Sequence, residues 1–266
     1  MISRVHHLNC GTLRPLGAPS MVCHVLLLET DAGLVLVDTG LGLADITAPA
    51  ARLTGGLARV IRPDFAPVET AAAQVEALGF DRSDVTHIVA THLDSDHTGG
   101  IDDFPGATVH TTATELQSAR GTRGIPAAVR YRPWRRSNEP AVTAYDMFRA
   151  DWFGFAAAYL KPLGDDALLV PLPGHTPGHA GVAVRSGDGW LLHCGDAFYH
   201  RAAVFGGPVP ASLRAGQFIS ATGRREARAT RDRLAETFAD GAGSVRLVCA
   251  HDPVMFAEAA LGNIER

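Results

Sequence analysis

The stretch ATHLDSDHTGG, Ala90 to Gly100, brings two histidines and two aspartates into six residues and ends in paired glycines. Alternate residues of an extended segment face the same side. His92 and Asp94 can therefore bind one metal ion, while Asp96 and His97 turn toward a second. Imidazole nitrogens and carboxylate oxygens are ordinary ligands of first-row metals. The stretch therefore predicts a metal site, and it guides the interpretation of the remaining sequence.

The composition is that of an ordinary soluble globular enzyme. The chain has 266 residues, of which 46% are apolar and 20% are charged, and its net charge is −4. Non-specific binding to a phosphate backbone needs a basic excess, so we expect a small-molecule substrate and no nucleic acid partner. The longest apolar runs are only as long as strands, which predicts no association with a membrane.

The cysteines and the first residues favour a cytoplasmic protein. Cys10, Cys23, Cys194 and Cys249 are scattered without CxxC spacing, so we expect buried, reduced thiols. The opening MISRVHHLNC has no apolar core of the length that a secretory signal peptide needs. A single lysine among many arginines is typical of a GC-rich bacterial genome.

One arrangement recurs along the chain, namely a strand, then Asp or His, then a tight turn. It occurs at Asp38, His92, His175, Asp196 and His251. Residues 21–38 predict a β-hairpin, and the segments 67–79 and 223–241 predict helices. Layered α/β folds place their chemistry at strand ends that share one edge of a sheet. The pattern therefore predicts an α/β fold with its site at such an edge.

Residues 115–164 have a different character, because arginine, aromatic residues and proline crowd together there. We expect this segment to be an insertion in a single domain that spans residues 1–266. Aromatic side chains would exclude water from a site if the segment were a lid. The same residue types are enriched at interfaces, so a homodimer contact is an equal alternative.

Each candidate ligand has an ordinary structural explanation when taken alone. A histidine at a strand end is often only hydrogen-bonded, and Asp96 could be the N-cap of the following helix. The joint pattern favours a metal site, because four histidines and three aspartates fall at strand ends where folding requires no charge. Two ions a few ångströms apart need about seven protein groups and a bridging oxygen.

The motifs together resemble the metallo-β-lactamase superfamily, whose dinuclear signature is HxHxDH followed by His, Asp and His. This chain has an HxDxDH variant, His92-x-Asp94-x-Asp96-His97. The later positions are His175 in PGHTPGH, Asp196 in CGDA and His251 in CAHD, and Asp38 in VDTG matches the upstream motif. The resemblance covers residues 21–253 except the 115–164 segment.

The resemblance implies a four-layer αββα sandwich, with two mixed sheets packed face to face and the metals at one edge. His92, Asp94 and His175 would hold the first of two divalent ions. Asp96, His97 and His251 would hold the second ion, and Asp196 would bridge the two. Asp38 would lie behind the ligands, where it hydrogen-bonds and orients a ligand histidine, and His179 would lie behind them too or be structural.

Asp94 stands where the family signature has histidine, so an anionic oxygen replaces a neutral nitrogen. The site becomes harder, which favours iron or manganese relative to a nitrogen-rich site, although zinc still binds mixed sets and is the expected metal. The flavodiiron branch of the superfamily carries a carboxylate at this position. An intact dinuclear site is the main expectation, with a mononuclear or a lost site as alternatives.

The implied chemistry is metal-dependent hydrolysis. The ions would lower the pKa of a bridging water and supply hydroxide, and Asp96 would accept or relay the proton. Tyr199 follows Asp196 by three residues, and N-acyl-homoserine lactone lactonases have a tyrosine there that contacts the substrate carbonyl or leaving oxygen. We therefore predict opening of a small ester, lactone or related carbonyl compound. The alternatives are an iron-containing oxidoreductase, a small-molecule phosphodiesterase and a non-catalytic metal-binding protein.

Overall fold

The run MVCHVLLLET forms strand β2 (Met21–Thr30), which is buried along nearly its whole length. Its side chains alternate between two cores, because Leu26 and Leu28 face the opposite sheet while Leu27 faces the outer helices. A continuous apolar run is typical of a strand that is covered on both faces. The β2 strand pairs with β3 (Gly33–Val37), which confirms the predicted hairpin.

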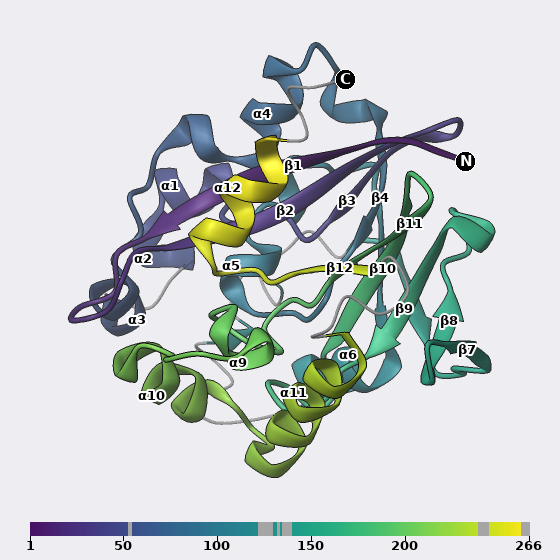
Figure 1. The fold of residues 1–266 in the computed structure, drawn as a ribbon. Coiled ribbons are helices and arrows are strands. Elements are labelled where there is room, and N and C mark those ends of the chain that lie inside the picture. Colours follow the sequence, from purple (N-terminus) through teal and green to yellow (C-terminus); the bar gives the residue numbers. More distant parts are fainter. Residues whose placement is uncertain (53–54, 122–129, 132–133, 135–139, 239–244, 262–266) are drawn as a thin grey trace.

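The computed structural model describes residues 1–52, 55–121, 130–131, 134, 140–238 and 245–261. In this part of the chain, two six-stranded mixed sheets pack face to face (Figure 1). The first sheet has the order β1 (Ile2–Leu13), β2, β3, β4 (Val85–Val89), β5 (Thr108–Thr112) and β6 (Val142–Tyr145). The second has the order β12 (Val245–Val248), β11 (Gly189–His193), β10 (Ala180–Ser186), β9 (Ala167–Pro171), β8 (Phe155–Tyr159) and β7 (Ala150–Trp152).

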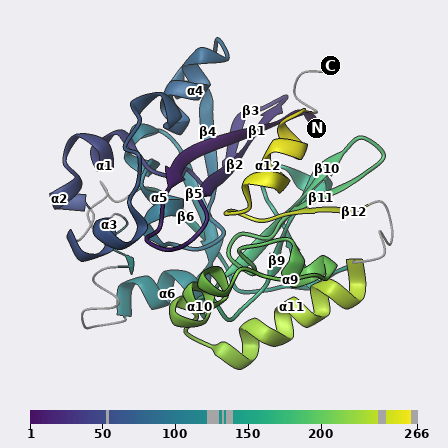
Figure 2. The same ribbon diagram turned by 60° about the vertical axis from the view of Figure 1, so that its left-hand side comes forward.

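Helices cover the outer face of each sheet, which confirms the four-layer αββα sandwich. Helix α4 (Ala71–Ala77) packs its buried alanines against the first sheet, on the side where α1 (Leu43–Thr47), α2 (Pro49–Arg52) and α3 (Gly55–Ile61) also lie (Figure 2). Helix α11 (Arg224–Phe238) packs Leu234 and Phe238 against the second sheet. The remaining helices are α5 (Ser95–Thr98), α6 (Ala113–Gly121), α9 (Ala202–Phe205), α10 (Ala211–Ser220) and α12 (Pro253–Leu261).

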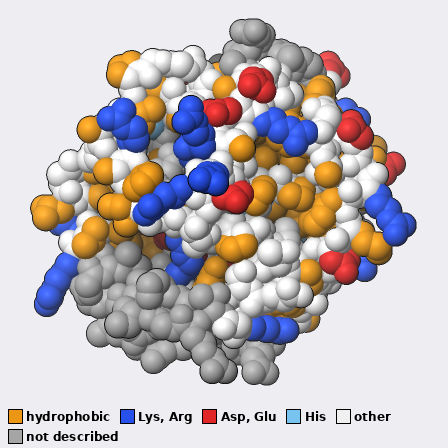
Figure 3. All heavy atoms as spheres, turned by 90° about the horizontal axis from the view of Figure 1, so that it is seen from below, with side chains coloured by type: hydrophobic (Ala, Val, Ile, Leu, Met, Phe, Trp, Pro, Cys, Tyr) orange, Lys and Arg blue, Asp and Glu red, His pale blue; other side chains and the backbone are white. Residues whose placement is uncertain are grey.

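The predicted helices are present with adjusted ends. Helix α4 begins after Thr70, whose hydroxyl accepts a hydrogen bond from the Ala73 amide, and a short 3₁₀ turn, Pro67–Glu69, precedes it. Helix α11 presents exposed arginines to solvent, and Figure 3 shows this face of the molecule with basic side chains between apolar ones. None of the described helices combines the length and apolar character that a membrane span needs.

The sequence missed one element, and one of its expectations needs correction. Residues 2–13 form the long edge strand β1, which the sequence did not indicate. The second half of the 115–164 segment is not an insertion, because its strands β6, β7 and β8 extend both sheets. The first half includes residues outside the described part of the chain, so the lid and the dimer contact stay predictions.

The loop after β4 is held from behind by a buried ion-pair network. Arg52 Nε lies 3.3 Å from Asp45 Oδ1, and Arg52 Nη1 lies 3.0 Å from Asp102 Oδ2. Arg52 Nη2 also donates a hydrogen bond to the Gly99 carbonyl at 3.0 Å. Because Asp45 and Arg52 are both buried, the network fixes the turn that follows the HxDxDH motif.

Gly99 must be glycine for steric reasons, since a Cβ there would lie 2.0 Å from Asp45 Oδ2 and 2.9 Å from the Gly40 carbonyl oxygen. We predict that Gly99→Ala lowers the free energy of unfolding by about 1–3 kcal/mol, the usual cost of overpacking a tight site. Chemical denaturation measures this change. Gly106→Ala is the control, because a Cβ at Gly106 meets nothing within 4 Å. Equal stability of the two variants would contradict the steric account.

Candidate metal centre

The predicted ligands lie just beyond the ends of four strands. Strand β4 ends three residues before His92, and β9 ends four residues before His175. Strands β11 and β12 end three residues before Asp196 and His251, respectively. The short strands fix the backbone, and the following loops turn these side chains toward one another.

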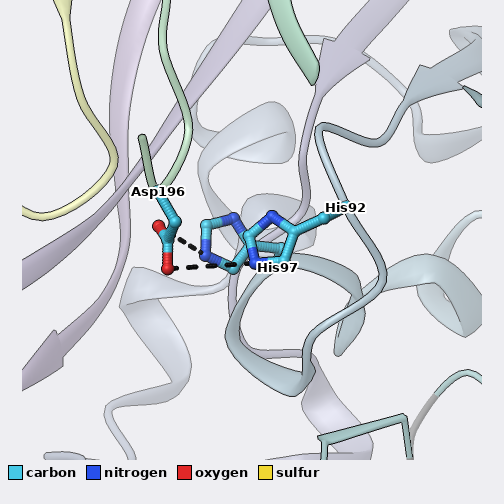
Figure 4. Close-up of side chains that lie close together, drawn as sticks. All are labelled: His92, His97 and Asp196. Atoms are coloured by element: carbon cyan, nitrogen blue, oxygen red, sulfur yellow. Dashed lines mark ion pairs between the residues drawn. The ribbon is translucent and has the colours of Figure 1, made fainter. Parts of the chain in front are cut away.

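The side chains form groups whose ligand atoms all lie within 4.8 Å of one another. The groups are His92, Asp94 and His175; Asp96, His97 and His251; and His92, His97 and Asp196. The first two groups are the sets predicted for the two ions. Figure 4 shows His92 and His97, from the segment that follows β4, converging with Asp196 from a separate segment of the chain.

Asp196 connects the two sides of this centre through its two carboxylate oxygens. Oδ2 lies 3.4 Å from His175 Nε2 and 3.8 Å from His92 Nε2. Oδ1 lies 3.2 Å from His97 Nε2 and 3.1 Å from His251 Nε2. Because each oxygen faces a different pair of imidazoles, the carboxylate has the arrangement needed to bridge two ions.

Several of these polar atoms are buried without a hydrogen-bond partner. They are His92 Nε2, His97 Nε2, His175 Nδ1, Asp94 Oδ1 and Asp196 Oδ1. A buried polar atom without a partner costs free energy, and such atoms are uncommon in folded proteins. Two divalent cations between the groups would satisfy the Nε2 atoms and the Asp196 oxygen. The donor set of imidazoles and carboxylates therefore fits a metal centre.

Asp38 orients two of the histidines. Its Oδ2 accepts hydrogen bonds from His97 Nδ1 and Thr91 Oγ1, each at 2.8 Å, and its Oδ1 accepts from the Thr91 amide. Because the Thr91 hydroxyl proton points to Asp38, Thr91 Oγ1 accepts from His92 Nδ1 at 3.0 Å. Both rings therefore direct Nε2 toward the groups above.

His179 holds the backbone of the bridging residue and is not a member of any ligand group. Its Nδ1 donates to the Leu172 carbonyl at 2.8 Å, so the unprotonated Nε2 accepts from the Asp196 amide at 2.9 Å. Gly195 lies beside it with φ +50°, and a Cβ there would approach His179 Nε2 to 2.6 Å. The CGDA motif thus needs its glycine for this contact.

Charge attraction within the centre outweighs the effect of burial on its carboxyl groups. Burial raises the pKa of Asp196, but His251, His97 and His175 hold it well below its usual value. Burial likewise opposes ionisation of Asp94, but the Arg130 guanidinium and His92 hold its pKa well below the ordinary range. Both residues are therefore carboxylates at neutral pH, the form that binds metals.

Of the two residues predicted to take part in catalysis, Asp96 belongs to the second group and Tyr199 lies beside it. Asp96 Oδ2 is 3.6 Å from His251 Nε2, and its side chain is 20% exposed where that of Asp196 is 3% exposed. Asp96 lies within the first turn of α5 and is not its N-cap, which is Asp94. The Tyr199 ring lies 5.0 Å from that of His251, and its hydroxyl is 2.9 Å from Ser220 Oγ.

Sequence reasoning missed two charged residues at this centre. The buried carboxylate of Glu115 accepts from the Leu93 amide at 3.0 Å and from Thr176 Oγ1 at 2.6 Å, so it joins two ligand loops. Thr112 and Glu115 have the spacing of a capping box, a signal that marks the start of α6 but not this contact. Arg130 contacts Asp94, and nothing in its local sequence distinguishes it from neighbouring arginines.

We predict that Asp38→Asn weakens metal binding by about 10–100-fold, as expected when a group that orients a metal ligand is lost. The backbone at Asp38 has φ 60°, a conformation that asparagine tolerates, so the change tests the carboxylate and not the turn. Competition with a chromophoric chelator measures the affinity. Asp188→Asn in an exposed turn is the control, and an unchanged affinity for Asp38→Asn would contradict this role.

Comparisons with known proteins agree with the fold. A family model described as the metallo-β-lactamase superfamily matches residues 19–239. A Mycobacterium tuberculosis protein named probable metallo-hydrolase is 45% identical over 255 residues, which are 95% of this chain and 81% of that protein. An N-acyl homoserine lactonase of Agrobacterium fabrum is 30% identical over 164 residues, which are 60% of this chain and 58% of that protein.

A solved structure with the same fold is an N-acyl homoserine lactone hydrolase with the product N-hexanoyl-L-homoserine bound at its catalytic metal centre. The TM-score is 0.71, and the superposition covers 97% of this chain and 96% of that one. The sequence identity is 16%, so this likeness shows the fold and not the substrate.

Proposed function

This chain belongs to the metallo-β-lactamase superfamily, and we propose that it is a dinuclear metal-dependent hydrolase that opens a small lactone or ester. The observation that carries the proposal is the Asp196 carboxylate, whose two oxygens face different groups of histidines. The similarity to a lactonase over 60% of the chain supports the choice of substrate class.

In this proposal His92, Asp94 and His175 would hold one ion, the second group would hold the other, and Asp196 would lie between them. Zinc suits the mixed nitrogen and oxygen ligands, and iron or manganese is compatible with the additional carboxylate. Two such cations would acidify water and polarise a substrate carbonyl. The second group comprises Asp96, His97 and His251.

The protein side chains supply proton transfer and orientation. Asp96 is the most accessible carboxylate of the centre, so it accepts the proton of the attacking water. Burial, followed by the Asp196 charge, raises the pKa of Tyr199 well above its usual value, so the phenol stays protonated and can donate a hydrogen bond. On substrate binding, the Tyr199 hydroxyl would leave Ser220 and donate a hydrogen bond to the carbonyl oxygen or the leaving oxygen of the substrate.

We predict that the purified protein hydrolyses members of a panel of acyl homoserine lactones, simple lactones and aryl esters. A chelator removes this activity, and zinc restores it. A phosphodiester such as bis(p-nitrophenyl) phosphate is the comparison substrate. Turnover of the phosphodiester alone would favour the phosphodiesterase alternative. If protein with both metal sites filled turned over none of these substrates, the alternative of a non-catalytic metal-binding protein would be favoured.

We predict that Tyr199→Phe lowers kcat for the best lactone or ester by about 10²-fold, the usual effect of removing one hydrogen-bond donor to a developing oxyanion. Metal content stays unchanged, because the hydroxyl contacts Ser220 and no ligand group. Steady-state kinetics and metal analysis measure the two effects. Tyr159→Phe on β8, where the side chain is about half exposed, is the matched control. Full activity of Tyr199→Phe would exclude the proposed contact.

A further inference from the structure

The two oxygens of Asp94 face in different directions. Oδ2 lies 2.9 Å from His175 Nε2 and 3.4 Å from His92 Nε2, so it belongs to the first ligand group. Oδ1 is buried without a hydrogen bond and lies 3.4 Å from Arg130 Nε. One carboxylate thus joins the ligand group to a guanidinium.

Arg130 is held on the far side of that carboxylate by two backbone carbonyls. Its Nη1 donates to the carbonyl of His175 at 3.2 Å, and its Nη2 donates to the carbonyl of Ser220. The side chain is 16% exposed. A planar guanidinium with several anchored donors keeps a fixed position, which a lysine ammonium would not.

The charge of Arg130 has no equivalent among the other partners of the centre. In the described part of the chain, the other ion pairs of Asp94, Asp96 and Asp196 are all with histidines. Histidines must be neutral to bind a metal, so they cannot offset a carboxylate once ions are present. Arg130 stays charged in either state.

We propose that Arg130 is a positioning residue of the metal centre and that it works as one unit with Asp94. The guanidinium holds Oδ1, directs Oδ2 toward His92 and His175, and offsets the charge that the carboxylate brings. This inference rests on the proposed metal centre. It implies that an aspartate at position 94 requires the arginine. With a neutral ligand at that position, the positive charge of Arg130 would repel the metal cation and weaken its binding.

A double-mutant cycle with Arg130→Gln and Asp94→His tests the pair. In the natural chain, Arg130→Gln weakens binding of one of two zinc ions by about 10-fold, because Asp94 is no longer held. Asp94→His alone also weakens binding, since the buried guanidinium faces a neutral ligand and a cation. Adding Arg130→Gln to Asp94→His restores binding by about 10-fold, which is a change of the opposite sign.

Chelator competition measures these affinities. Arg130→Lys keeps the charge but loses the anchored guanidinium, so it restores only part of the zinc binding that Arg130→Gln loses. Arg14→Gln at an exposed ion pair with Asp64 is the control and leaves zinc binding unchanged. If Arg130→Gln changed the zinc affinity in the same direction and by the same factor in the natural chain and in the Asp94→His variant, the proposal would be overturned.

Thermal unfolding of the metal-free proteins separates this result from a failure of the proposed function. If the natural chain binds no metal, the proposed function is wrong. The natural chain, the two single variants and the double variant still test whether Arg130 and Asp94 are coupled. The double variant should then melt above the value expected from adding the two single effects. If the two single substitutions shifted the melting temperature additively, coupling between Arg130 and Asp94 would be excluded, whatever the metal content of the natural chain.

Discussion

The candidate metal centre depends on one buried carboxylate, that of Asp38, held in a left-handed backbone conformation at the end of β3. Non-glycine residues seldom adopt this conformation, and it persists where surrounding contacts require it. Here it lets a single carboxylate accept from His97 and, through Thr91, fix His92. Without it, both imidazoles would be free to turn Nε2 away from the centre.

The remaining contacts follow from the need to bury charged ligands side by side. The two oxygens of Asp196 face different pairs of histidines, and His179 accepts a hydrogen bond from the backbone amide of Asp196. Glu115 joins the loops that carry the first group. Each contact orients a ligand before any cation arrives, so little of the binding energy is needed to order the site.

Apolar runs followed by polar residues were sufficient to predict an α/β fold with its site at strand ends. The four-layer sandwich and the pairing of His92 with Asp196 were implied by the resemblance of the motifs to a known superfamily. The sequence did not indicate β1, whose polar residues and register shift near Asn9 interrupt the strand pattern and whose pairing with β2 defines it. Arg130 and Glu115 reach partners between 22 and 90 residues away in sequence. No local pattern encodes such contacts, which only the folded chain creates.

The central claim is that the two groups of histidines and aspartates joined by Asp196 hold two ions. The most direct test is the metal-to-protein ratio, measured by elemental mass spectrometry on protein purified without added metal or chelator and again after reconstitution with zinc. The account predicts about two ions per chain. Two irons would keep the centre but favour redox chemistry over hydrolysis. One ion or none after reconstitution would contradict the account.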